Sequence, residues 1–218
     1  MPCVTGDKLI RQSGLEGVLI TDDLYCRLPR EADPAAENRA LRALAAMLST
    51  SPQQMLHTLM REALPLCNAD TSGLSVLHHD GKGNDFFRWD AMAGVLSDKV
   101  GGTTPSDWSP CGTTLSMGEP QLFSYPGRTF HYFLDVDPQI VEGLVVPIYY
   151  NGLPLGTIWV VTHDDDPARK FTLTEVRTMK GLANFTSAAM SRMGDGARGT
   201  DSAGILSTPS LDGSNGLR

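Results

Sequence analysis

The sequence lacks the features of a membrane protein, a secreted protein and a nucleic-acid-binding protein. No apolar run approaches the roughly 20 residues that cross a bilayer, and Asp7 and Lys8 stand where a secretory signal would have its apolar core. No Lys/Arg cluster could follow a phosphate backbone, and 18 basic against 25 acidic residues give a net charge of -7. We therefore expect a cytoplasmic protein whose direct partners include neither a membrane nor nucleic acid.

Cysteine is scarce, and its spacing signals no known framework. The four cysteines, Cys3, Cys26, Cys67 and Cys111, are far apart and include no C-x-x-C pair. This pattern indicates neither a zinc site nor a set of disulfides, so we expect reduced thiols that mostly fill space as small hydrophobic groups.

The two candidate metal sites are both poorly arranged for binding. His78 and His79 are adjacent, and neighbouring residues on a strand point to opposite faces. The acidic run at residues 164–166 lacks the alternating ligands and the glycine of a calcium loop. We predict no metal site, and the sequence identifies no cofactor.

The length of 218 residues, with 41% hydrophobic and 20% charged residues, fits one globular domain with tails. We predict an N-terminal extension over 1–36, in which the apolar run at 17–20 forms an added edge strand or a docked arm. The domain itself spans 37–193. Residues 194–218 are rich in Gly, Ser, Asp and Thr, which predicts a flexible, disordered tail.

Three helices carry clear signals. From Glu37 an apolar stripe at helical spacing predicts a helix, and Ser51-Pro52-Gln53-Gln54 begins a second one that continues to about residue 67. Thr172-Leu173-Thr174-Glu175 is a capping box that opens a C-terminal helix reaching residue 193. The apolar faces of these helices should cover one side of a sheet.

Strands are predicted between the helices, and the strongest hairpin signal is Asn151-Gly152 between two β-rich runs. A two-residue turn there sets the register, with Tyr150 opposite Leu153 and Leu144 opposite Trp159 on one interior face. Two further strands are expected around 74–76 and 86–89.

Residues 97–140 are broken by Gly and Pro, and an irregular stretch of this length favours a functional site. Within it Ser109 should cap a short helix that begins at Pro110 and ends at Gly118. Aromatic side chains and polar groups around this stretch suit a ligand pocket. We predict as ligand-binding residues Trp89, Asp107, Trp108, Ser109, Cys111, Thr113, Arg128, His131, Tyr132 and Glu142.

Cys111 stands near the start of this short helix, where the positive end of the helix dipole favours a thiolate. No Lys, Arg or His adjoins it to support activation. A reactive thiol and a packing role both remain open at this stage.

The segment Gly143–Gly152, followed by Leu155-Gly156-Thr157, resembles the strand, Pro, turn and Gly-containing return strand of a GAF domain. The stretches 102–105, 109–113 and 157–164 resemble, more narrowly, the GAF domains that open certain bacterial sensor histidine kinases. The resemblance implies an α+β fold (an α/β sandwich). In it, a central antiparallel sheet of five or six strands has the N- and C-terminal helices on one face and a loop-built pocket on the other.

In this family the domain is a sensory input that binds a small molecule, a chromophore or a partner helix and changes the output of a neighbouring domain. The resemblance therefore implies a small-molecule ligand and, as a partner, a histidine kinase output segment. We also expect a homodimer through the terminal helices, because the Leu41 and Leu56 stripes and the Met-rich last helix offer more apolar surface than one sheet face can cover. No phosphoacceptor helix or ATP lid is recognisable, so we expect no kinase activity of this chain, and Cys111-Gly112 lacks the His that usually follows a bilin-linking Cys. Two alternatives are a free methionine sulfoxide reductase using Cys111, and a structural domain whose pocket is closed by Trp and Tyr.

Overall fold

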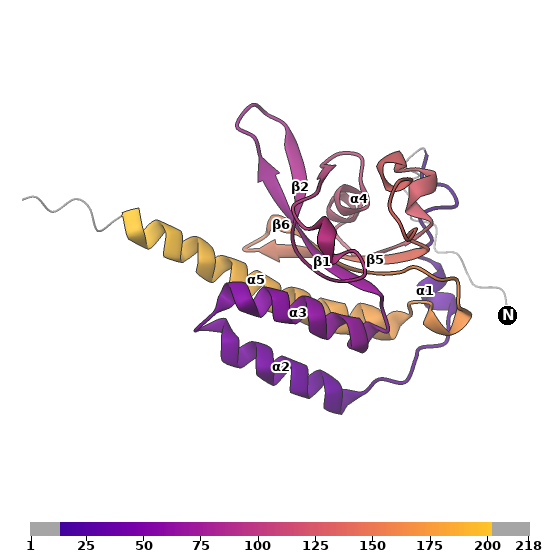
Figure 1. The fold of residues 1–218 in the computed structure, drawn as a ribbon, viewed down its shortest axis with the longest axis horizontal. Helices are drawn as coiled ribbons and strands as arrows, with labels where there is room; N and C mark the ends of the chain where they lie inside the picture. Colours follow the sequence, from indigo (N-terminus) through magenta and orange to yellow (C-terminus); the bar gives the residue numbers. More distant parts are fainter. Residues whose placement is uncertain (1–13, 202–218) are drawn as a thin grey trace, which may run out of the picture.

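A computed structural model describes residues 14–201 of the chain. One six-stranded sheet, of order β3-β2-β1-β6-β5-β4, forms the centre (Figure 1). Its strands are β1 (Thr71–His79), β2 (Asp85–Gly94), β3 (Thr103–Pro105), β4 (Gln121–Ser124), β5 (Glu142–Tyr150) and β6 (Leu153–Thr162). Every pairing of neighbouring strands is antiparallel. This arrangement confirms the predicted α+β class and the antiparallel sheet, and its six strands agree with the predicted five or six.

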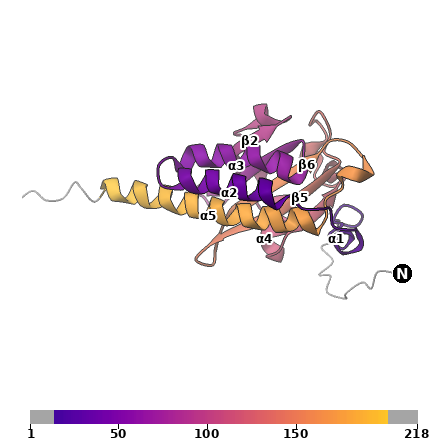
Figure 2. The same ribbon diagram turned by 90° about the horizontal axis from the view of Figure 1, so that it is seen from below.

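Three long helices, α2 (Pro34–Leu48), α3 (Pro52–Cys67) and α5 (Leu173–Asp201), lie side by side on one face of the sheet (Figure 2). The other face carries α4 (Pro110–Met117) and the 3-10 turns η1 (Ser97–Lys99), η2 (Pro126–Arg128) and η3 (His131–Phe133). The helical face and the sheet enclose one apolar core, built on fully buried side chains such as Leu44, Leu59, Met60, Leu74, Leu144 and Met179. A second apolar cluster fills the opposite face, where the candidate site lies.

The first helix of the body begins earlier than predicted. The carboxylate of Asp33 accepts hydrogen bonds from the backbone N–H groups of Ala35 and Ala36, and Pro34 occupies the first helical position, where its missing N–H costs nothing. The helix therefore starts at Pro34 rather than at Glu37. The Thr172 capping box is confirmed, because the Glu175 carboxylate accepts from the Thr172 N–H at 2.7 Å.

Residues 14–33 form an arm docked at the edge of the sheet, one of the two arrangements expected for the apolar run at 17–20. Leu19 pairs with Phe123 at the free edge of β4, and the Ile20 N–H donates to the Leu122 carbonyl at 2.8 Å. The arm continues through α1 (Asp23–Cys26) to α2 and buries Leu15 and Val18 against the second apolar cluster. Residues 1–13 of the predicted extension lie outside the described residues.

The Asn151-Gly152 hairpin is confirmed, with both turn residues at positive φ (51° and 78°). The predicted register is right only at its closed end, where Tyr150 pairs with Leu153. A bulge between Ile148 and Tyr149 shifts the rest, so Trp159 pairs with Val145 instead of Leu144. Because one residue of slip reverses the face, Trp159 joins the second cluster, opposite to Leu144.

The last helix runs beyond its predicted end. α5 continues through Asp201, so the first eight residues of the segment predicted as a disordered tail are helical. Extending an existing helix costs far less free energy than nucleating a new one, and amino-acid composition alone does not show this effect. The rest of the predicted tail, residues 202–218, lies outside the described residues. Within the part of the chain that is described, no helix combines the length and apolarity that a bilayer crossing needs.

Cys26 corrects the expectation that all thiols are reduced, because it is disulfide-bonded. Cys67 and Cys111 are free and buried. They lie on opposite sides of the sheet, Cys67 in the helical core and Cys111 in the second cluster.

Candidate functional site

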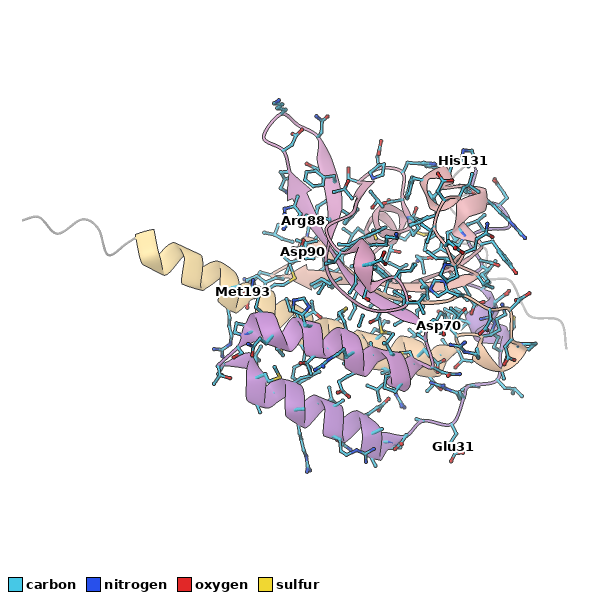
Figure 3. All side chains as sticks on the ribbon, viewed as in Figure 1. Glu31, Asp70, Arg88, Asp90, His131 and Met193 are labelled. Carbon is cyan, nitrogen blue, oxygen red and sulfur yellow. The ribbon has the colours of Figure 1, made fainter. Side chains whose placement is uncertain are left out.

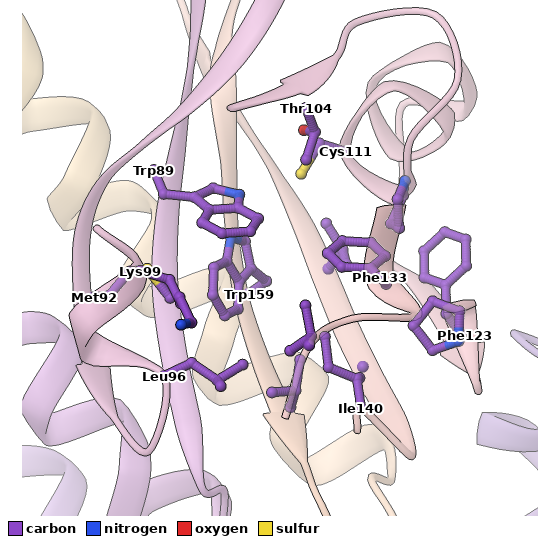
Figure 4. A pocket seen from close by; sticks show the side chains of 16 residues that line it. Trp89, Met92, Leu96, Lys99, Thr104, Cys111, Phe123, Phe133, Ile140 and Trp159 are labelled. Carbon is purple, nitrogen blue, oxygen red and sulfur yellow. The ribbon is translucent and has the colours of Figure 1, made fainter. Parts of the chain in front are cut away.

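A small cavity lies between the second face of the sheet and the irregular segment 97–140, as predicted (Figure 4). Its free volume is about 50 Å³, enough for a few atoms of ligand beside the present side chains. We call the covering stretch 126–140, which contains η2 and η3, the roof. The cavity is lined by Trp89, Met92, Leu96, Lys99, Thr104, Pro110, Cys111, Phe123, Pro126, Phe133, Val136, Ile140, Gly143, Val145, Trp159 and Val161.

Four aromatic rings form part of the cavity wall. The planes of Trp89 and Phe133 are nearly parallel, at 3° with 6.4 Å between centroids, and Trp159 meets Trp89 edge-on. The Trp159 ring is held by its N–H, which donates to the Ser75 hydroxyl at 2.8 Å. These rings give the cavity flat, rigid and apolar surfaces.

Helix α4 closes one end of the cavity and forms as the sequence predicts. The Ser109 hydroxyl accepts from the Gly112 N–H at 3.0 Å, and Gly118 ends the helix at φ 73°. This places the Cys111 side chain inward, beside the hydroxyls of Ser75 and Thr157. Burial raises the pKa of the Cys111 thiol, and these hydroxyls offset that effect only in part. The thiolate that a helix start would favour is therefore not stabilised here.

Few polar atoms reach the cavity. The Thr104 hydroxyl is buried, with 3% of the residue exposed, and has no hydrogen-bond partner. Lys99 is the one charged residue of the lining. Figure 4 shows Thr104 beside Cys111 at one end of the ring of side chains, with Leu96 and Ile140 at the other end.

The end of the roof is fastened to the sheet by His163. One ring nitrogen lies 2.9 Å from the Thr71 hydroxyl and the other 2.9 Å from the Gln139 carbonyl. The Thr71 oxygen also accepts from the Leu96 N–H at 3.2 Å. The Gln139 carbonyl can only accept, so Nδ1 of His163 carries a proton and donates to it.

Asp70 continues this connection toward the last helix. It accepts from the His163 N–H at 2.8 Å and from Arg169 at 2.6 Å. Partial burial raises the pKa of Asp70, but these hydrogen bonds outweigh burial and hold its pKa below the usual range. Arg169 belongs to η4 (Pro167–Arg169), just before α5. A polar chain thus runs from the roof to the approach to α5.

The family model of the GAF domain matches residues 51–190. The chain belongs to the GAF domain family. No curated protein matches the chain.

Solved structures give the same result for the fold of this GAF domain. The GAF domain of an Acinetobacter phosphoenolpyruvate-protein phosphotransferase superposes with a TM-score of 0.60 at 13% identity, over 73% of this chain and 95% of that chain. Free methionine-R-sulfoxide reductase from Neisseria meningitidis, in complex with its substrate, gives 0.60 at 14% identity over 78% and 98%. A phycoerythrobilin-bound GAF domain from a cyanobacterial phytochrome gives 0.56 at 14% identity over 74% and 97%. At these identities the likeness establishes the fold.

Two of the ten residues predicted to bind ligand line the cavity of this GAF domain, namely Trp89 and Cys111. Ser109 and Thr113 are buried in and before α4, and so help to place Cys111. Trp108 lies outside the cavity against Phe130, at 5.5 Å between ring centroids. The Tyr132 hydroxyl donates to the Trp108 carbonyl at 3.2 Å.

The remaining four do not line this cavity. Asp107, Arg128 and His131 are exposed, and Figure 3 shows His131 at the outer edge of the molecule. Arg128 lies over the ring of Tyr125, 4.3 Å from its centroid. All three belong to the irregular segment that covers the cavity, but Arg128 and His131 lie in 3-10 turns, which direct neighbouring side chains to different sides, and Asp107 lies in a bend before α4.

Glu142 requires a clear correction. It is 1% exposed and forms a two-pronged ion pair with Arg27 of the docked arm, at 2.8 and 2.9 Å. It also accepts from the Phe171 N–H at 2.8 Å. Since its neighbour Gly143 faces the cavity, strand alternation turns Glu142 to the other face. It holds the arm, β5 and the approach to α5 together.

Several cavity residues escaped sequence reasoning. Lys99 and Thr104 come from short elements within a stretch that appeared wholly irregular. Trp159 was expected on the face of Leu144, and the bulge in the hairpin turns it to the cavity face, where Val145 lies. An alternation count restarted after Gly156, whose φ of 153° lies outside the range of ordinary strand residues, would have placed Trp159 there.

Proposed function

We propose that this GAF domain is a sensory module that binds a small molecule in the cavity and transmits the event through α5. The observation that carries the proposal is the cavity itself, which is apolar and partly walled by aromatic rings, with Thr104 and Lys99 among its lining residues. The similar proteins from Neisseria and from the cyanobacterial phytochrome hold a substrate and a bilin, which supports binding of small molecules by this fold. The free volume of about 50 Å³ favours a ligand much smaller than a bilin.

A chain of polar contacts offers a route by which ligand binding could be transmitted from the roof to α5. The roof contacts His163, which contacts Asp70, which contacts Arg169 beside α5. Helix α5 is 29 residues long, or about 43 Å at 1.5 Å per residue, and projects past α2 and α3 (Figure 1). A ligand that displaces the roof would change these contacts and so the position of α5. We propose that the output is a histidine kinase of bacterial signal transduction in the cytoplasm, joined to this domain through α5.

The reductase alternative is less well supported by the geometry. It needs an attacking thiolate and a resolving thiol. Burial raises the pKa of Cys111, and Cys67, the other free thiol in the described residues, lies across the sheet. We therefore propose binding without catalysis.

Native mass spectrometry of the protein purified from its own host tests the proposal. We expect a small-molecule mass adduct on the wild-type protein. Val145→Phe, which adds a ring to a cavity with little free volume, should lose the adduct. Val95→Phe makes the same substitution at a residue that is 54% exposed, and should keep it. An adduct retained by Val145→Phe, or no adduct on the wild type, would contradict binding in this cavity.

A further inference from the structure

The chemistry of the lining defines a class of ligand, given the proposed function on which this inference rests. We infer that the cavity takes a single aromatic ring that bears a hydroxyl or carbonyl oxygen for Thr104 and an anionic group for Lys99. The simplest members of this class are hydroxybenzoates. Each part of the description follows from a separate feature of the lining.

The sign of the charge follows from the ionisable groups. Lys99 is charged, and the lining contains no Asp or Glu. An aromatic wall can attract a cation through its ring faces, but the Lys99 ammonium opposes that attraction and nothing in the lining neutralises a bound cation. The Lys99 side chain is 48% exposed and pairs with Asp98 at 3.1 Å, an exposed pair that is weak and easily exchanged for a ligand anion.

The oxygen group follows from Thr104. Its hydroxyl is buried in the lining and has no partner, although buried hydroxyls in folded proteins are nearly always hydrogen-bonded. A ligand oxygen at this end of the cavity would satisfy it. The neighbouring Cys111 is a weak donor and acceptor and cannot replace an oxygen in that role.

The ring and its size follow from the walls. Trp89 and Phe133 present nearly parallel planes, and Trp159 presents its edge to Trp89, which suits a flat ligand. The free volume of about 50 Å³ is smaller than one substituted ring, so the Lys99 side chain and the roof side chains must move aside to admit a single ring. Two fused rings would require displacement of the roof backbone.

Calorimetric titration of the intact chain with three probes tests the inference. The probes are 4-hydroxybenzoate, benzoate without the hydroxyl, and 4-hydroxybenzylamine with the opposite charge. We expect the affinity to fall in that order, with the amine at least about tenfold weaker than 4-hydroxybenzoate because it places a cation beside Lys99.

Two variants with matched controls assign the contacts. Lys99→Met should weaken both acids by about tenfold and narrow the gap to the amine, whereas Lys82→Met in the β1–β2 turn should change nothing. Thr104→Val should weaken 4-hydroxybenzoate by about fivefold and leave benzoate unchanged, and Thr104→Ser should restore the loss. Thr103→Val, at the exposed neighbour in β3, is its control.

Each adverse result has a definite meaning. An amine that binds the wild-type protein as tightly as 4-hydroxybenzoate overturns the charge assignment, whether or not any variant folds. Equal effects of Lys99→Met and Lys82→Met on the affinity for the two acids would also overturn the charge assignment. If no probe binds but a host molecule is found on the wild type and lost in Val145→Phe, the ligand class is wrong and the sensory function stands. If neither probes nor host molecule bind, both fail.

Discussion

The indole of Trp159 covers the backbone of Gly73 so closely that a Cβ atom at position 73 would lie 2.2 Å from Cζ2 of the ring. The two residues are paired across β1 and β6. Trp159 can therefore lie flat on the sheet and form a wall of the cavity only because residue 73 has no side chain. The glycine and the tryptophan act as one unit of the site.

Gly73→Ala should displace the indole and destabilise the protein by about 1–3 kcal/mol, the usual cost of overpacking a core. It should also weaken ligand binding, because the cavity wall moves. Gly181→Ala is the matched control in α5, where an added Cβ meets nothing within 4 Å. That change should stabilise the protein by about 0.5–1 kcal/mol through helix propensity. Urea unfolding of both variants measures the difference, and equal destabilisation would refute the account.

The buried ion pair of Arg27 and Glu142 should matter far more than an exposed one. Arg27→Met leaves the 1% exposed carboxylate of Glu142 without its main partner and should cost about 3 kcal/mol of unfolding free energy. Arg177→Met removes an exposed partner of Glu37, at 3.5 Å, and should cost less than about 1 kcal/mol. Chemical denaturation of the two variants decides this. Similar costs would show that the arm is not held by the ion pair.

Alkaline pH should destabilise the fold through its buried thiols. Burial raises the pKa of both Cys67 and Cys111 above the ordinary value of 9.0, so above about pH 9 the unfolded chain loses protons that the folded chain keeps. Stability contributed by these thiols is complete below that pH and is lost as pH rises, by up to about 1.4 kcal/mol per pH unit for each thiol. Melting curves of the wild type, Cys67→Ala and Cys111→Ala across pH 8 to about 10.5 measure the slope. The slope should be shallower in each variant, and an unchanged slope in both would contradict the assignment.

The helical face should mediate dimerisation. Leu41 is only partly buried on α2 and belongs to an apolar stripe that one sheet face does not fully cover. We expect a dimer by light scattering at micromolar concentration, weakened by Leu41→Lys. Ala43→Lys adds the same charge at an exposed neighbour and should have a smaller effect. A wild-type monomer at these concentrations would contradict dimerisation through this face.

The sequence predicted the helices and the hairpin well because their signals are local. Ser109, Gly118 and the Asn151-Gly152 turn each determine the backbone over only a few residues, and all three occupy the predicted positions. Likewise the capping box at Thr172 needs only Glu175. Local hydrogen bonds and φ preferences are readable without knowledge of the rest of the fold.

The site was harder to predict because it depends on long-range placement. One bulge, at Leu155 of β6, moved Trp159 to the other face of the sheet, and a count of alternating residues fails beyond a bulge that the sequence does not reveal. Glu142 appeared suitable for a ligand, yet Arg27, 115 positions away in sequence, occupies it. Chemistry-bearing side chains in an irregular segment can be named from sequence, but their direction is set by tertiary packing.

Fluorine NMR of protein labelled with 5-fluorotryptophan tests the central claim most directly, since the chain has three tryptophans. Trp89 and Trp159 line the cavity, while Trp108 lies outside it and is 41% exposed. With signals assigned by Trp→Phe variants, addition of the molecule recovered from the host, or of 4-hydroxybenzoate, should shift the Trp89 and Trp159 resonances and leave that of Trp108 in place. A shift confined to Trp108, or no shift with a molecule that demonstrably binds, would show that the cavity is not the binding site.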